Sequence, residues 1–567
     1  VARQALAALA AEPAPAPEPR RRAWTVVADQ AFDGGDFAQA EAAYGQALAL
    51  LPAGATDLAT VRTGLQQRQA AAIYRQGEQA RERGDLRAAV GHFDRVAALG
   101  PVAATAGVRA SARFDAAAAL VGLKDWAGAA GALEAFRRDF PGHPLQAEVA
   151  PKLALADMEL GRDSAAAREF DRVAAAATDP ALARSAQWQA AELDAKAAAD
   201  AAPRSALLVQ AIQAAQRYVQ RWPQPLEPAV EARWRLAQLA QRNGQPREAA
   251  DWLRAVQHSD AAAGDARTPR TRTLGGRATL ALAEPLRLAY EQVRLVEPLA
   301  RQLKLKKARL EAALQAYAAA AEPGIAEVTT EATFRTGALY QDFGRALLDS
   351  ARPRLSPAER AQYDAMLDEQ AFPFEEKAIA LYETNARRTR EGLYDPWVQQ
   401  SLAALARLKP VRWGKVERAD AALPAEAAAL QAALDALPRA PSPDPHRAAL
   451  LNQLGIALRR QGQFEPARQA YEAAIAADPG ALAPRLDLAI LADLYLGDRA
   501  RAQALYEQCA ALSPPDAPLL GKWLAEIKAR KPAPETQAGQ TAQAAQAPQP
   551  AQPAQPAQAA ADRKEMP

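Results

Sequence analysis

Residues 451–479, LNQLGIALRRQGQFEPARQAYEAAIAADP, decide the fold. Large apolar side chains recur at helical spacing before Gly462 and again after it, which predicts two amphipathic helices joined by a turn. Gly455 and Ala467 stand where the two antiparallel helices would cross, because only small side chains permit a close approach. Tyr471 would then fill the space between neighbouring helices, so the stretch predicts a helical hairpin built to stack on others.

The same frame returns with a period of 34 residues in two parts of the chain. The copy nearest the N-terminus matches it position for position, and further, less exact copies follow up to residue 258. One more copy follows the clearest one, but it is displaced by one residue. The matching positions in the copy nearest the N-terminus are Trp24, Val27, Ala28, Ala31, Gly35, Phe37, Ala40, Tyr44, Ala47 and Pro52.

Along residues 21–258 and 446–515 the sequence resembles the tetratricopeptide repeat (TPR) family. That resemblance implies an all-α fold, an α-solenoid in which pairs of antiparallel helices stack into a right-handed superhelix. It also implies a role, because TPR proteins usually hold peptide segments or helices of partner proteins in the concave groove. We therefore expect other proteins to be the partners of this chain.

Composition and periodicity divide the chain into six parts. We expect one extra helix near residues 56–69 to interrupt the first array. The parts are a Pro/Ala-rich linker at 1–20, a TPR array at 21–258, a linker at 259–277, an atypical helical region at 278–437, a TPR pair with a final helix at 438–530, and a disordered Ala/Gln/Pro tail at 531–567.

The region at 278–437 is helical but does not repeat cleanly. Ser356 to Glu359 form a capping box, and Pro285 and Pro298 are expected where helices begin. Aromatic residues gather between Phe372 and Val398. Residues 325–415 resemble a region of bacterial envelope TPR proteins, some encoded with gliding-motility or TonB–ExbB-type systems.

The residues show no pattern of catalytic or metal-binding chemistry. Four histidines are scattered over separate repeats, and no phosphate-binding loop or nucleophile elbow is present. The only cysteine, Cys509, takes the small crossing position of the last repeat and is expected to be a buried thiol. We predict no enzyme activity, no cofactor and no metal; the alternative is a catalytic unit hidden in 278–437.

Two basic clusters offer a second alternative, a cytoplasmic regulator that binds nucleic acid through residues 267–309. One cluster lies in the predicted linker and the other on a single helix, but neither interleaves aromatic side chains for base stacking. The whole chain is nearly balanced, with 69 basic and 66 acidic residues. We therefore favour solvated helix faces and expect no nucleic acid.

Inner-face positions of the repeats supply the candidate binding residues. In TPR proteins the first helix of each pair lines the concave surface, and exposed aromatic and arginine side chains are common anchors for peptides. The candidates for a partner-binding groove are Tyr74, Arg81, Phe114, Trp234, Arg242, Asn452, Arg459 and Arg460.

These observations predict a scaffold or adaptor of the bacterial cell envelope. We expect a periplasmic location, with membrane association or envelope complexes, and keep the cytoplasm as the alternative. No apolar stretch long enough to span a membrane is visible. The chain begins with Val1 rather than Met, which fits a removed signal peptide, a trimmed chain or an alternative start codon.

Overall fold

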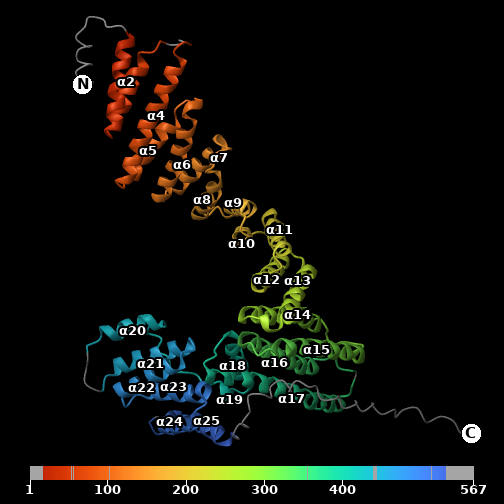
Figure 1. Ribbon diagram of the computed structural model, residues 1–567. Coiled ribbons are helices and arrows are strands. Elements are labelled where there is room, and N and C mark those ends of the chain that lie inside the picture. The colour runs from red at the N-terminus through yellow and green to blue at the C-terminus, as the bar shows by residue number, and fades with distance from the viewer. Residues whose placement is uncertain are drawn as a thin grey trace, which may run out of the picture. The chain divides into compact units, whose positions relative to one another are not determined.

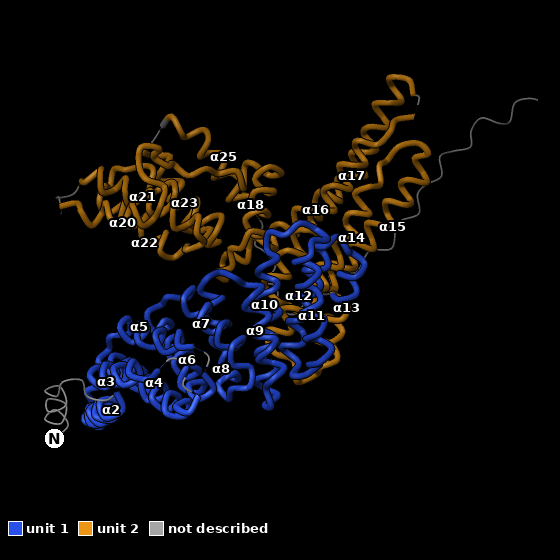
Figure 2. Tube along the Cα trace, turned by 90° about the horizontal axis from the view of Figure 1, so that it is seen from above, with its two compact units in different colours: residues 1–252 blue, residues 253–567 orange. Residues whose placement is uncertain are grey.

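The computed structural model describes residues 17–530 except 53, 55, 101, 354, 439–442 and 513. All regular structure in these residues is helical, which confirms the all-α fold. The chain forms two compact units, residues 1–252 and 253–567 (Figure 2). The predicted disordered tail at 531–567 lies outside the described residues, as do residues 1–16 of the predicted N-terminal linker.

The first unit is a run of antiparallel helix pairs (Figure 1). Tight turns at Gly35, Gly84, Gly161 and Gly244, all with positive φ, join helices within pairs. Its helices are α2 (Pro17–Asp33), α3 (Phe37–Ala49), α4 (Ala59–Glu82), α5 (Leu86–Ala97), α6 (Ala106–Gly122), α7 (Trp126–Asp139), α8 (Gln146–Glu159), α9 (Asp163–Ala176), α10 (Pro180–Ala197), α11 (Ala206–Arg221) and α12 (Leu226–Arg242), with α13 (Pro246–Ala261) running across the boundary between the units.

The extra helix expected near residues 56–69 does not exist as a separate element. Helix α4 runs without a break through 24 residues, so this stretch lengthens the first helix of its pair. Residues 56–69 contain no Pro, and their one glycine, Gly64, lies inside the continuous helix with nothing packed within 4 Å of its Cβ position. The irregular period reflects a longer helix rather than an added one.

The second unit contains the off-period region and the clearest repeat. Its helices are α14 (Pro269–Glu291), α15 (Leu299–Ala321), α16 (Ala326–Leu348), α17 (Pro357–Arg387), α18 (Pro396–Leu408), α19 (Pro410–Trp413), α20 (Ala427–Ala436), α21 (Pro445–Arg460), α22 (Phe464–Ala477), α23 (Leu482–Leu491), α24 (Arg499–Leu512) and α25 (Ala517–Ala529). The capping box of Ser356 and Glu359 starts α17 as predicted.

Two local predictions were wrong. Residues 259–277, expected to be a linker, are largely helical, because α13 continues to Ala261 and α14 begins at Pro269 with Thr268 as its cap. Pro285 was expected at a helix start but lies inside α14. Pro298 directly precedes α15, as expected for a residue at a helix start.

One hydrophobic core joins the off-period region to the last repeats. It contains Tyr382 of α17, Leu405 of α18 and Trp413 of α19, together with Tyr506 of α24 and Trp523 of α25. Helices α19 and α25 lie side by side in it (Figure 1). The boundary that we predicted at residues 437 and 438 therefore does not separate two cores.

The one-residue displacement of the last repeat has a structural counterpart. Residues Ala492–Leu496 form a π-helical turn between α23 and α24. A π turn accommodates one extra residue without breaking the helix. It thereby restores the packing frame, so that Tyr506 and Cys509 are fully buried at the expected aromatic and small positions.

The crossing of α21 and α22 generates the first prediction. A methyl group added at Gly455 would lie 2.6 Å from Cδ1 of Tyr471, whereas one added at Gly521 of α25 meets nothing within 4 Å. Gly455→Ala should lower the free energy of unfolding by about 1–3 kcal/mol through overpacking. Gly521→Ala, the matched control, should raise it by about 0.5–1 kcal/mol. Urea denaturation measures both; equal effects would contradict the crossing argument.

Candidate protein-binding groove

The first helices of the last two repeats, α21 and α23, form an inner face that we call the C-terminal groove. Asn452 and Arg459 lie seven residues apart on α21 and therefore share one side of that helix. Asp487 reaches the same place from α23, and its Oδ2 accepts a hydrogen bond from Nδ2 of Asn452 at 3.0 Å. The groove thus presents an amide, a guanidinium and a carboxylate together.

An extended stretch of the same chain occupies the C-terminal groove. Residues 414–420, the groove segment, follow α19 and have neither helical nor strand structure. From residue 415 to residue 418 the side chains alternate: Lys415 is buried, Val416 is 76% exposed, Glu417 has a side chain only 7% exposed, and Arg418 is exposed. Alternation with a period of two is the geometry of an extended peptide that lies with one face in a groove.

Groove side chains bind the main chain of the groove segment. The amide N–H of Arg418 donates to Oδ1 of Asp487 at 2.8 Å, and Nδ2 of Asn452 donates to the carbonyl of Arg418 at 3.2 Å. The N–H of Asp420 donates to Oε1 of Gln453 at 3.1 Å. These bonds replace the ladder of a strand and fix the register without depending on the segment's side chains.

Glu417 enters a basic pocket in the C-terminal groove. Its carboxylate accepts two hydrogen bonds from the Arg459 guanidinium, one of them from Nε at 2.9 Å, and a third from the hydroxyl of Tyr471 at 3.0 Å. The guanidinium also lies 5.3 Å from the ring centre of Tyr495. Burial opposes the charge of Arg459, but the bonds to Glu417 outweigh it and raise its pKa.

Lys415 enters a separate, acidic pocket. Its side chain is fully buried, forms an ion pair with Asp493 of the π turn and lies 3.9 Å from Glu526. The ring centres of Tyr506 and Trp523 are 4.9 Å and 5.5 Å from Nζ. Burial lowers the pKa of Lys415, while the ion pair with Asp493 opposes that effect. Breaking such a buried pair from one side costs about 3–5 kcal/mol.

Two of the three candidate residues in the second unit contact the groove segment, and the third is exposed to solvent. Asn452 and Arg459 both line the C-terminal groove, where they hold the groove segment. Arg460 is exposed. That these three residues bind other proteins stays a prediction, whereas the C-terminal groove holds an extended segment of its own chain.

The candidates in the first unit occupy several environments. The hydroxyl of Tyr74 and the guanidinium of Arg81, both on α4, bind Asp115 of α6. Phe114 is buried in a core cluster and 7% exposed, so its ring is not offered to a partner in this conformation. Trp234 is half-buried, and Arg242 donates to the main-chain carbonyls of Ala198 and Ala199.

Sequence reasoning missed the residues that complete the groove, namely Lys415, Glu417, Asp487 and Asp493. The one available signal was the alternation of charge in Lys415-Val-Glu-Arg-Ala-Asp420, directly after a short helix. That pattern is common in exposed loops and did not indicate where the stretch would lie.

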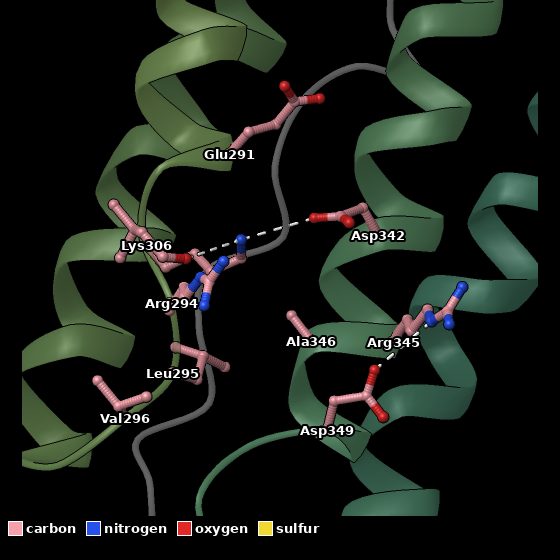
Figure 3. A pocket seen from close by; sticks show the side chains of 10 residues that line it. Glu291, Arg294, Leu295, Val296, Lys306, Asp342, Arg345, Ala346 and Asp349 are labelled. Atoms are coloured by element: carbon pink, nitrogen blue, oxygen red, sulfur yellow. Dashed lines mark hydrogen bonds and ion pairs between the residues drawn. The ribbon is translucent and has the colours of Figure 1, made fainter.

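An open cavity of about 550 Å³ beside α15 and α16 lies within residues 278–437, the region in which a hidden catalytic unit was the alternative (Figure 3). Its acidic side chains are already paired: Glu291 with Arg287, Asp342 with Lys306 at 3.5 Å, and Asp349 with Arg345 at 3.5 Å. Each of the three acidic side chains that line the cavity therefore has a basic partner. Among the described residues, no three His, Cys, Asp or Glu side chains group to hold a metal ion.

The buried thiol and the basic clusters are also visible. Cys509 is buried as predicted, and burial raises the pKa of its thiol to about 11, so the thiol stays protonated at neutral pH. Within the clusters, Arg267 pairs with Asp260 and Lys306 is buried. Part of the positive charge expected for nucleic acid is therefore neutralised or hidden.

Comparison with known proteins supports the repeat. The family model described as tetratricopeptide repeat matches residues 448–481. Together with the helix pairs of both units, this match makes the chain an all-α, TPR-like helical repeat protein, a fold that is typically non-catalytic and binds proteins. No curated protein is significantly similar to the chain. None of the described helices is both long and apolar enough to cross a membrane.

Several solved helical-repeat structures show a weak overall likeness. Naa15/Naa10 bound to HypK-THB is 13% identical over 90% of this chain, with a TM-score of 0.28, and this chain covers 66% of that one, slightly less than two thirds. A tetratricopeptide repeat protein from Parabacteroides merdae is 14% identical over 56% of this chain and 98% of its own, with a TM-score of 0.21. Yeast Tom70 is 12% identical over 82% and 88%, with a TM-score of 0.20.

Asp487 gives a prediction about pH. Burial raises its pKa from 3.8 to about 7, although the Arg418 N–H opposes the rise. The folded state therefore binds a proton that the unfolded state has lost, so this group lowers stability as pH rises from about 4 to about 7. The Asp487→Asn protein lacks this titrating group and should not lose stability in this way. The difference in free energy of unfolding, variant minus native protein, should therefore increase by about 1 kcal/mol for each pH unit between pH 5 and 7. Denaturation at each pH measures it, and a constant difference would contradict it.

Proposed function

We propose that the protein is an adaptor that holds extended segments of partner proteins on the inner faces of its repeats. One observation carries this proposal: the C-terminal groove already holds an extended peptide, the groove segment, by main-chain bonds and two charged pockets. Main-chain bonds give affinity for any extended segment, and pockets for alternate side chains give selectivity. The chemistry of protein recognition is thus present in this chain.

The inner face of the first unit supplies a second surface of the same kind. The hydroxyl of Tyr74 donates to Oδ2 of Asp115 at 2.5 Å, and Arg81 donates to Oδ1 of the same carboxylate at 3.2 Å. The Arg81 side chain remains 42% exposed. These bonds hold an aromatic ring and a guanidinium in fixed positions, which lowers the entropy lost when a partner binds.

We also propose that the adaptor acts in the bacterial cell envelope, in the periplasm and with complexes of the gliding-motility or TonB–ExbB kind. The support is the resemblance of residues 325–415 to envelope TPR proteins and the Pro-rich sequence at both ends. A single cysteine fits the periplasm and the cytoplasm alike, because one thiol cannot form an internal disulfide.

The inner face of the first unit can be tested with a partner isolated by crosslinking. Tyr74→Ala and Arg81→Ala should each raise the Kd of the purified partner by about tenfold, the effect of losing an anchor worth about 1.4 kcal/mol. Arg87→Ala, an exposed residue on α5, is the matched control and should change the Kd less than twofold. Isothermal titration with unchanged affinity in both test variants would remove this face from the proposal.

The envelope location has its own test. In bacteria that produce the protein from its complete gene, osmotic shock should release it together with a periplasmic marker enzyme. Retention with a cytoplasmic marker, in cells whose periplasmic marker is fully released, would contradict the location and leave the adaptor proposal intact.

A further inference from the structure

Two pockets hold the groove segment, the basic one in the C-terminal groove and the acidic one beside it, and they define the chemistry of the peptide that fits there. The pocket around Lys415 combines two carboxylates, Asp493 and Glu526, with the faces of Tyr506 and Trp523. Carboxylates and aromatic faces both attract a cation. Arg530 pairs with both carboxylates from the other side, and the lysine that enters is fully buried, so the pocket fits the compact ammonium group and narrow aliphatic stem of a lysine.

The second pocket is matched to a carboxylate two residues further on. The guanidinium of Arg459 offers a fork of two N–H groups, and the hydroxyl of Tyr471 offers a third donor. Bidentate pairing of this kind favours a carboxylate over a neutral group. A neutral side chain here would leave Arg459 buried without its counter-charge, which is strongly unfavourable.

Between and beyond these pockets the segment is held by its main chain, apart from the guanidinium of Arg418, which donates to Asp516 at 2.7 Å. Asp487 and Asn452 bind the N–H and the carbonyl of Arg418, and Gln453 binds the N–H of Asp420. The side chain of Val416 points to solvent and is 76% exposed. The Arg418–Asp516 pair is partly exposed and contributes little. The buried pockets therefore place the strict condition on two side chains only, a Lys and a Glu separated by one residue.

We propose that the C-terminal groove is a site for extended Lys-x-Glu peptide segments, and that residues 415–417 of the same chain occupy it as an internal ligand that a partner segment must displace. This inference rests on the proposed function and names the partner chemistry and the regulation of one groove. The observation behind it is the occupied groove itself, in which both charged pockets are filled and three bonds hold the main chain of the segment.

Tethering sets the strength of this self-occupation. The groove segment is covalently held between α19 and α20, so its effective concentration at the groove is on the order of millimolar. A free peptide of equal intrinsic affinity then competes against that concentration, and its apparent Kd rises toward the millimolar range. Weakening the internal segment should recover tighter binding of the same peptide.

The experiment uses the full chain and a fluorescently labelled synthetic peptide with the sequence of residues 411–422. The native protein should bind it with an apparent Kd of about a millimolar or weaker. The Glu417→Gln protein, whose internal ligand lacks the carboxylate, should bind it at least tenfold more tightly. The Val416→Ser protein is the matched control, because the same segment is altered on its solvent side, and should bind as the native protein does.

A second peptide tests the selectivity. With its Lys415→Glu and Glu417→Lys changes it keeps the composition and net charge but reverses the two pockets' ligands, and the Glu417→Gln protein should not bind it. Equal binding of both peptides by this variant would overturn the Lys-x-Glu assignment. Tight binding of the unaltered peptide by the native protein would overturn the self-occupation, and failure of the Glu417→Gln protein to bind it more tightly would overturn the displaceable ligand.

Hydrogen exchange gives a measurement that needs no variant. The amides of Arg418 and Asp420 should exchange slowly in the native protein although they lie outside any helix, because they donate to Asp487 and Gln453. Millimolar unaltered peptide should speed their exchange, and the charge-exchanged peptide should not. Unchanged protection with both peptides would show a fixed structural strap and overturn the proposal. The inner-face variants of the first unit take no part in these tests, so this inference and the adaptor function can fail separately.

Discussion

Two antiparallel helices can approach closely only where one of them lacks a bulky side chain, and the rest of this structure depends on that constraint. Gly77 lies beneath the ring of Phe93, and Gly455 beneath the ring of Tyr471, in each case without room for a methyl group. The ring covers the bare backbone of the facing helix and excludes water from it. Each such contact fixes the crossing point of a helix pair, and the crossing points determine where the inner-face side chains stand.

The same contact occurs in the region that showed no period. A methyl group at Gly337 of α16 would lie 2.8 Å from Cε1 of Tyr382 on α17. In the regular repeats the glycine and the ring are 16 residues apart (471 − 455 and 93 − 77), but here the separation is 45 (382 − 337). The rule of small residue against ring is unchanged, while helices of 23 and 31 residues place its members far beyond a 34-residue window.

This difference explains how much the sequence could predict. Hairpins of standard length could be predicted because each crossing residue falls at a fixed sequence distance from its ring. The last copy could be predicted as well, once its frame was shifted by one residue. The lengths of the helices in the second unit and of α4 could not be predicted, because helix length depends on tertiary packing. Pro298 and the capping box at Ser356 mark only where α15 and α17 begin. For the C-terminal groove, Asn452 and Arg459 followed from helical position alone. Their ligands Glu417 and Arg418 lie 42 and 34 residues away along the chain, and no local rule joins them.

The groove segment connects two hydrophobic clusters, so it is anchored at both ends. At one end Trp413 lies in the core and Lys415 is surrounded by Asp493 and the two aromatic rings. At the other end Asp420 is exposed, but the chain continues into α20, whose Leu430 and Leu434 pack with Leu450 and Leu454 of α21. Because both anchors lie outside residues 414–420, an incoming segment has to break only the contacts between them, namely the two charged pockets and the main-chain bonds to Asp487, Asn452 and Gln453.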